Sequence, residues 1–135
     1  MKIASRLFDK KVVLGRSVAR RGHVTEWKAG GEKPYTGKLT VLVDAGTQSA
    51  AEILAGALQE SGRARVFGRK TAGSVLLMLR RKLADGGELR LSVEDFVLAS
   101  GKRLEGVGVK PDVELALGIA QIRLGYDADV IAAAI

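Results

Sequence analysis

A strand pattern, a helix pattern and a second strand pattern follow one another near the middle of the chain. Residues 39–43, Leu-Thr-Val-Leu-Val, form a continuous apolar run of the kind found in strands buried on both faces. Residues 49–61 then place apolar side chains along one side of a helix, and Gly62 follows as a C-terminal stop. A short strand is expected at 63–67. Only a few residues separate each of these elements from the next, which predicts a βαβ unit with two parallel strands and a right-handed crossover.

Ser49 begins the predicted helix, and two interpretations of it remain open. The first amides of a helix have no intrahelical partner and the helix dipole is positive there, so this end stabilises negative charge beside a nucleophilic serine. Ser49 and Glu52 are also spaced as a capping box, in which hydroxyl and carboxylate bind backbone amides and no reaction occurs. Because serine caps many helices, this segment alone favours the cap.

The remaining elements are predicted from alternation and turn residues. The apolar alternation of 88–98, together with 75–83, indicates a half-exposed antiparallel hairpin that turns at Asp85-Gly86-Gly87. The whole is one α/β domain spanning residues 1–135, without a repeat or linker. The other expected elements are a helix at 2–8, a basic hairpin formed by 12–14 and 24–27, a segment at 106–112 that closes the sheet, and a helix at 128–135 capped by Asp127.

Composition excludes several classes of site. The sequence has 22 Lys and Arg against 15 Asp and Glu, and the net charge of +7 favours acidic partners. These cations are dispersed and only 4% of residues are aromatic, which argues against nucleic-acid binding. The sequence contains no cysteine and a single histidine, so no metal site and no cofactor is predicted. No apolar run reaches about 18 residues and the N-terminus is interrupted by charge, so neither a membrane span nor a signal peptide is predicted.

Several blocks recur in an order that is specific to one family. They are Ser49 to Gln59, Gly62-Arg63-Ala64, Gly68, Thr71 and Gly73, Leu83 to Gly87 with Leu89, Gly101, Gly106-Val107-Gly108-Val109, and Pro111-Asp112. These blocks resemble the C-terminal processing (tail-specific) serine peptidases. The resemblance implies an α/β peptidase core like those of Clp protease and crotonase, built from βαβ units with an antiparallel hairpin on its C-terminal side. It also suggests a bacterial cell envelope or periplasmic location.

The resemblance assigns roles to individual residues. Ser49 corresponds to the nucleophile that attacks a peptide carbonyl to form an acyl-enzyme, and the amide of Ala50 to an oxyanion donor. The family's lysine base falls at Ser74 and its supporting glutamine at Met78. Neither residue here can take a proton as a desolvated lysine amine does. The form Thr71-Ala72-Gly73 resembles tricorn-like branches instead, in which an upstream histidine is the base.

Two residues are weak candidates for the missing base. His23 is the only histidine, but it lies in the expected basic hairpin, where a surface or turn histidine is the simpler interpretation. Lys70 is near the family's lysine position, and its simpler interpretation is an exposed loop lysine. Glu60, at the far end of the same helix, is interpreted as a helix-end charge.

The resemblance further implies that a second part of the catalytic domain precedes Met1. In the family that part carries a Gly-rich turn, whose amide completes the oxyanion hole, and a PDZ module. The chain is therefore expected to be the C-terminal part of a serine endopeptidase domain, weak or inactive alone, whose polypeptide substrate adds as a strand to a sheet edge. The alternative is a non-catalytic peptidase remnant that binds peptides or associates with another subunit, either the missing half or a second copy.

Overall fold

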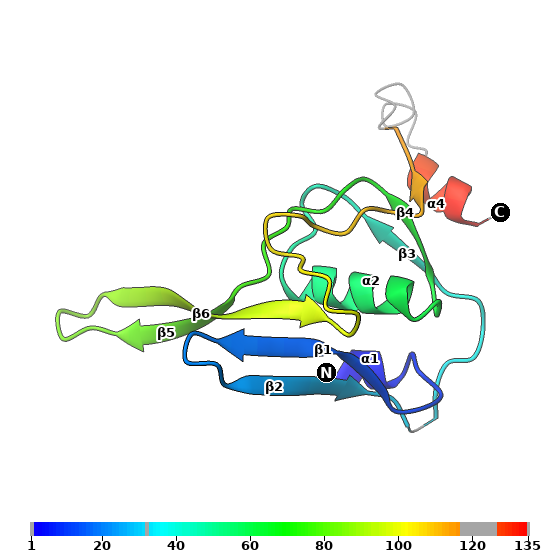
Figure 1. Cartoon of the computed structure of the whole chain (residues 1–135). Coiled ribbons are helices and arrows are strands. Elements are labelled where there is room, and N and C mark those ends of the chain that lie inside the picture. The colour runs from blue at the N-terminus through cyan, green and yellow to red at the C-terminus, as the bar shows by residue number, and fades with distance from the viewer. Residues whose placement is uncertain (1, 32, 117–126, 135) are drawn as a thin grey trace.

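The computed structural model describes residues 2–31, 33–116 and 127–134. Helix α2 lies between two sheets, with β1, β2 and β6 on one side and β3 and β4 on the other (Figure 1). The described elements are α1 (Lys2–Ser5), β1 (Val12–Ala19), β2 (Val24–Ala29), β3 (Thr40–Val43), α2 (Ala50–Glu60), β4 (Arg65–Gly68), β5 (Leu77–Lys82), β6 (Glu88–Leu98), β7 (Val113–Glu114) and α4 (Ala128–Ala133).

The predicted βαβ unit is confirmed as β3, α2 and β4. The two strands are parallel, from the pair Thr40 and Arg65 to the pair Val43 and Gly68. Helix α2 ends as expected, because Gly62 adopts a left-handed φ of 67° and its N–H donates to a carbonyl of the last helical turn at 3.0 Å. Strand β7 adds to the far side of β4, also parallel.

The prediction that the first strand of this unit is buried on both faces is wrong. Strand β3 is at the edge of the described sheet, whose order is β3-β4-β7. Only Val43 is buried in it, whereas Leu42 is 41% exposed. The apolar run of 39–43 is typical of a central parallel strand, but within the described residues only β4 pairs with it.

The second sheet is antiparallel, in the order β2-β1-β6-β5. Strand β1 continues to Ala19, beyond the predicted 12–14, because residues 15–18 pair with β2 on one side and residues 15–19 pair with β6 on the other. The buried face of this sheet carries Phe96, which meets Trp27 edge to face at 5.9 Å. The indole N–H of Trp27 donates to the buried Ser17 hydroxyl at 3.1 Å, so no polar group is left unpaired by this packing.

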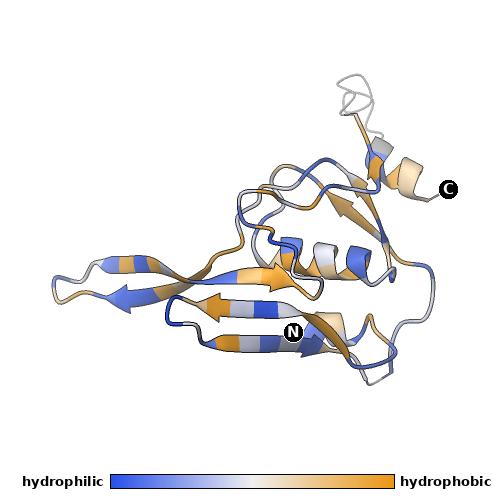
Figure 2. Cartoon of the chain, viewed as in Figure 1, coloured by the Kyte–Doolittle hydropathy of each residue, from blue (hydrophilic) through white to orange (hydrophobic). Residues whose placement is uncertain are grey.

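Strands β5 and β6 project from the body as an arm (Figure 1). Residues 88–92 of β6 pair only with β5, Glu94 pairs with both β5 and β1, and residues 95–98 pair with β1. Hydrophobic and hydrophilic residues alternate along β6 in the arm, whereas β5 is apolar at residues 77–79 and basic at residues 80–82 (Figure 2). The predicted antiparallel hairpin is confirmed, but the expectation that one of its faces is buried is wrong. Leu79 and Leu91 are opposite each other and are 50% and 45% exposed, because no described element covers the apolar face of the arm.

The core lies where α2 meets both sheets. Each large apolar side chain removed from water there contributes about 1.5–3 kcal/mol before the entropy of ordering is subtracted. The largest fully buried apolar side chains are Phe96, Leu14, Leu58, Leu98, Leu104, Val66, Val75 and Val109.

Of the three remaining predicted elements, two need adjustment and one begins where it was predicted. Helix α1 stops at Ser5 instead of residue 8, because the next two N–H groups bond to carbonyls three residues back in a tight turn. Residues 106–112 form a loop, and β7 closes the sheet after them. Helix α4 starts after Asp127 as predicted, since this carboxylate accepts hydrogen bonds from the N–H groups of Asp129 and Val130.

Candidate functional site

Ser49 occupies a backbone conformation that serine rarely adopts. Its φ is 58° and its ψ is −128°, and apart from Lys33 it is the only non-glycine residue with positive φ among those the structure describes. Such a conformation costs about 1–3 kcal/mol and persists only where surrounding contacts enforce it. The turn before it is fixed by Asp44, whose backbone N–H donates to the Thr47 hydroxyl at 3.0 Å. The result is an exposed serine on a sharp strand-to-helix turn.

The start of α2 offers a hydrogen-bond donor beside Ser49. In the described part of the chain, no acceptor is recorded for the N–H of Ala50, whereas the next two amides donate to carbonyls at 3.3 and 3.0 Å. The positive end of the helix dipole coincides with this open donor. An anion that forms at the Ser49 side chain therefore has one backbone N–H available within the same turn.

Glu52 is the polar centre of the site. Its side chain is fully buried, and four groups donate to it. Oε2 accepts the N–H of Ser49 at 3.2 Å and that of Ser74 at 2.8 Å. Oε1 accepts the hydroxyl of Thr71 and the N–H of Gly73, the latter at 2.7 Å. The bond from the Ser49 N–H is the carboxylate half of the predicted capping box.

Residues 71–76 pass beside Ser49 as an extended segment, which we call the strap. Its side chains alternate, with Thr71, Gly73 and Val75 buried while Ala72 and Ser74 are exposed. The carbonyl of Ser74 accepts the N–H of Ser49 at 2.8 Å. The strap therefore presents position 74, next to Ser49, on the solvent side.

The loop at 104–109 forms hydrogen bonds with the strap. The N–H of Gly106 donates to the carbonyl of Gly73 at 2.8 Å, and the N–H of Val109 donates to the Thr71 hydroxyl at 2.7 Å. Gly73 has a φ of 72°, and a Cβ there would meet the backbone N of Gly108 at 2.9 Å. The Gly-Val-Gly-Val block is thus linked through Thr71 to Glu52 and so to the helix that begins at Ser49.

The other candidates from the sequence lie at different positions around this centre. Met78, where the resemblance predicts the family's glutamine, is on β5 and 62% exposed. Lys70 is an exposed residue between β4 and the strap, and His23 is exposed beside the turn that joins β1 and β2. No side-chain hydrogen bond joins either of them to Ser49 in the described residues. Glu60 binds the N–H of Ser100 at 2.6 Å, which agrees with its interpretation as a helix-end charge.

The sequence did not predict that Thr71 and Glu105 hold the strap in place. Thr71 was noticed only as part of a motif, although its hydroxyl joins Glu52 to the 104–109 loop. Glu105 was not noticed at all, and it accepts hydrogen bonds from the N–H groups of Val75 and Leu76 at 2.7 and 3.2 Å. No periodicity links residues about 30 positions apart in a loop, so only the fold reveals this pair.

Helix α4 is attached near the turn that precedes Ser49. Arg69 and Asp129 form two hydrogen bonds, at 3.2 and 2.7 Å, and Asp44 lines the same cleft. The hydrogen bonds that the Arg69 guanidinium donates to Asp129 raise the pKa of Arg69 above its ordinary value. Because that value is already far above neutral, the ion pair does not lose its cation anywhere in the physiological pH range.

Within residues 2–31, 33–116 and 127–134, no group of three or more His, Cys, Asp or Glu side chains is arranged to hold a metal ion. No helix in this part of the chain has the length and apolar character needed to cross a bilayer.

Comparison with known proteins gives a consistent result. Residues 1–115 match the family model described as peptidase family S41. The carboxyl-terminal-processing protease of Synechocystis is 35% identical over 108 residues, which are 80% of this chain and 25% of that protein. The chain therefore spans about a quarter of the length of this curated relative.

Two solved structures share the fold. The photosystem II D1 C-terminal processing protease is 32% identical with a TM-score of 0.72, over 82% of this chain and 29% of that one. The tricorn protease is 24% identical with a TM-score of 0.75, over 98% of this chain and 13% of that one. The predicted peptidase-core fold is thereby confirmed.

Proposed function

Because the chain belongs to peptidase family S41, we propose that it carries the nucleophile of a serine endopeptidase and that this nucleophile is Ser49. The observation that supports this most strongly is the positive φ of Ser49 at the start of α2, next to an amide with no recorded acceptor among the described residues. A cap needs no such strain, since an N-cap residue ordinarily lies in the extended region.

The proposed reaction is acyl transfer. The Ser49 hydroxyl oxygen attacks a peptide carbonyl, the carbonyl oxygen becomes an oxyanion near the N–H of Ala50, and the amine leaves to give an acyl-enzyme that water hydrolyses. The hydroxyl proton must pass to a base, which then gives it to the nitrogen of the leaving amine. Ser74 cannot take it at neutral pH, so the base is Lys70, His23 or a group from another segment or subunit.

Weak activity of these residues alone is part of the proposal. One oxyanion donor is recognised here, and loss of one donor from such a site costs on the order of a hundredfold in rate. The chain also covers only a fraction of its relatives, 25% of the Synechocystis protease. A second protein segment that brings a base and a further donor is consistent with both facts.

Covalent labelling tests the proposal directly. A fluorophosphonate probe should label the folded protein, slowly, and Ser49→Ala should abolish the label. Ser61→Ala is the matched control, because Ser61 caps the other end of α2 with its hydroxyl 2.7 Å from the Ala57 carbonyl. Label that survives in Ser49→Ala, or a folded wild-type protein that takes no label at all, would contradict the assignment of Ser49.

A non-catalytic function is the second candidate, and the edge strand β3 favours it. Leu42 is 41% exposed there, and among the described strands only β4 pairs with β3. Such an edge can accept an added strand from a peptide or another subunit. Strand addition to a protein that takes no label would support this candidate over the enzyme.

A further inference from the structure

Every backbone N–H of the strap is bound, although the strap belongs to no sheet. The first two donate to loop carbonyls, since Thr71 meets Val109 at 3.1 Å and Ala72 meets Thr47 at 3.0 Å. The other four donate to two carboxylates. Glu52 accepts from Gly73 and Ser74, and Glu105 accepts from Val75 and Leu76. Two acidic side chains thus replace the neighbouring strand that an extended segment usually requires.

Glu52 and Glu105 bind the strap on either side of the Ser74 carbonyl, which accepts the Ser49 N–H. Glu52 comes from α2 and is fully buried, while Glu105 comes from the supporting loop and is half-buried. One oxygen of Glu105, Oε2, accepts both of its bonds, at 2.7 and 3.2 Å. The residue adjoining this anchor is Ser74, whose carbonyl accepts the Ser49 N–H at 2.8 Å. A shift of Val75 would therefore move the acceptor that holds Ser49.

We infer that Glu105 is a positioning residue for Ser49. It fixes the C-terminal end of the strap, so that the Ser74 carbonyl meets the Ser49 N–H and helps to keep Ser49 in its positive-φ conformation. The mechanical link from Glu105 through the strap to Ser49 rests on these contacts alone. Its consequence for catalysis rests on the proposed function. Glu105 does not touch the reacting atoms in this account, and it acts only through the strap.

Amide hydrogen exchange tests the mechanical link without any need for catalysis. Glu105→Ala and Glu105→Asp should both release Val75 and Leu76, because the shorter side chains cannot reach the two amides. Exchange at these residues and at Ser49 should accelerate roughly tenfold or more, as expected for the loss of hydrogen bonds to a charged group. Glu105→Gln keeps a carbonyl oxygen of the same reach and should preserve most of the protection.

The control substitution is Glu114→Ala. Glu114 is an exposed residue of β7 whose carboxylate lies 3.6 Å from the Lys110 ammonium. This substitution should leave the exchange rates at Ser49, Val75 and Leu76 unchanged. If the Ala variant does not fold, Glu105→Gln still shows whether protection of the two amides depends on the length of the side chain at position 105 or on its charge. Unchanged exchange at Ser49 in a folded Glu105→Asp variant would overturn the inference.

Labelling kinetics then test the catalytic consequence. For a positioning residue, Glu105→Asp should lower the maximal rate of fluorophosphonate labelling while the probe concentration at half-maximal rate stays the same, and Glu105→Gln should restore the rate. Faster exchange at Ser49 with an unchanged labelling rate would refute the positioning role. If the wild-type protein is not labelled, the proposed function fails, and the exchange data still decide whether Glu105 holds Ser49.

Discussion

Ser49 combines a strained backbone with an exposed side chain, and the strain distinguishes it from an ordinary cap. The contacts that impose it are on both sides of the residue: the turn at Asp44 to Thr47 before it, and Glu52 with the strap after it. The sequence predicted a serine at a helix start but not its φ, because positive φ at a non-glycine residue is imposed by tertiary contacts.

Glycine at position 49 tests this strain. Ser49→Gly should be at least as stable as the wild type, by up to about 1 kcal/mol, because glycine adopts a φ of 58° without the Cβ penalty. Ser49→Ala keeps the Cβ and loses the hydroxyl, so it should be less stable than either. Urea denaturation measures the difference. Equal destabilisation by both substitutions would show that Ser49 is not strained.

Glu52 should not tolerate its amide analogue. All four hydrogen bonds that it makes come from donors, two at each oxygen, and the Thr71 hydroxyl is itself already an acceptor for Val109. The NH₂ group of glutamine would face two of these donors in a buried site. Glu52→Gln should therefore lose about 3 kcal/mol or more in the free energy of unfolding.

The matched control is Glu60→Gln at the exposed end of the same helix, which should change stability by less than about 1 kcal/mol. If the two glutamine variants were equally stable, the four-donor description of Glu52 would be wrong.

At the scale of elements, local pattern predicted most of what forms. The parallel pair around α2, the C-terminal stop at Gly62 and the cap at Asp127 all follow from residue spacing, and each is present. The exposure of β3 could not be predicted in this way, because burial of a strand depends on which neighbours are present and not on its own apolar run. The strap could not be predicted either, because its partners are distant side chains.

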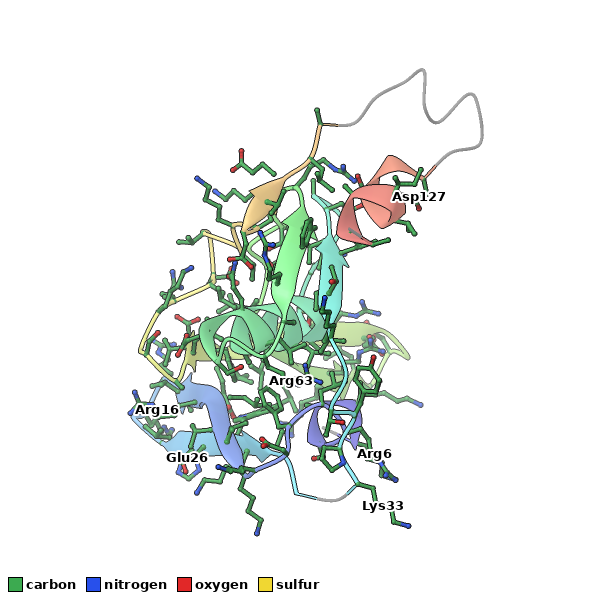
Figure 3. All side chains as sticks on the ribbon, turned by 90° about the vertical axis from the view of Figure 1, so that its right-hand side faces the viewer. Arg6, Arg16, Glu26, Lys33, Arg63 and Asp127 are labelled. Carbon is green, nitrogen blue, oxygen red and sulfur yellow. The ribbon has the colours of Figure 1, made fainter. Side chains whose placement is uncertain are left out.

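Arg63, in the link between α2 and β4, holds together its own segment, the turn after α1 and the loop before β3. Its guanidinium donates to the carbonyls of Leu7 at 2.7 Å, Tyr35 at 2.6 Å and Gly37 at 3.1 Å, and Figure 3 shows it between α2 and α1. It also lies over the Tyr35 ring, 5.8 Å from its centre. The planar fork of arginine satisfies these acceptors together, which a single ammonium group cannot do in the same geometry.

Arg63→Lys should lower the free energy of unfolding by about 1–2 kcal/mol, because charge is kept while two of the three hydrogen bonds are lost. Thermal or urea unfolding measures it. The control Arg65→Lys replaces a neighbouring exposed arginine whose recorded contact is with the Phe67 ring, and it should cost less. A fully stable Arg63→Lys variant would mean that the three segments are held by other contacts.

At the scale of the molecule, the fold is that of a family of peptidases, and the chain spans about a quarter of the length of a curated relative. At Ser74, where the sequence resemblance predicts the family's lysine, the backbone lies beside Ser49, joined by the 2.8 Å hydrogen bond from the Ser49 N–H to the Ser74 carbonyl. The family resemblance in the sequence predicted the fold and the identity of the nucleophile candidate. It did not predict how position 74 is held, because that depends on Glu52 and Glu105.

We predict that a base placed at position 74 of the strap would lie next to the proposed nucleophile Ser49, because the Ser74 carbonyl accepts the Ser49 N–H and the Ser74 side chain is exposed. Introducing lysine at position 74 tests it most directly, by the rate of fluorophosphonate labelling across a range of pH. Ser74→Lys should raise the rate on the order of tenfold to a hundredfold, with a pH dependence set by the new amine, since a positioned general base contributes at least about a hundredfold in complete sites. Ala72→Lys puts the same charge on the other exposed residue of the strap and should change little. If both variants label Ser49 at the wild-type rate, or if both accelerate it equally, position 74 is not the base position and the account is wrong.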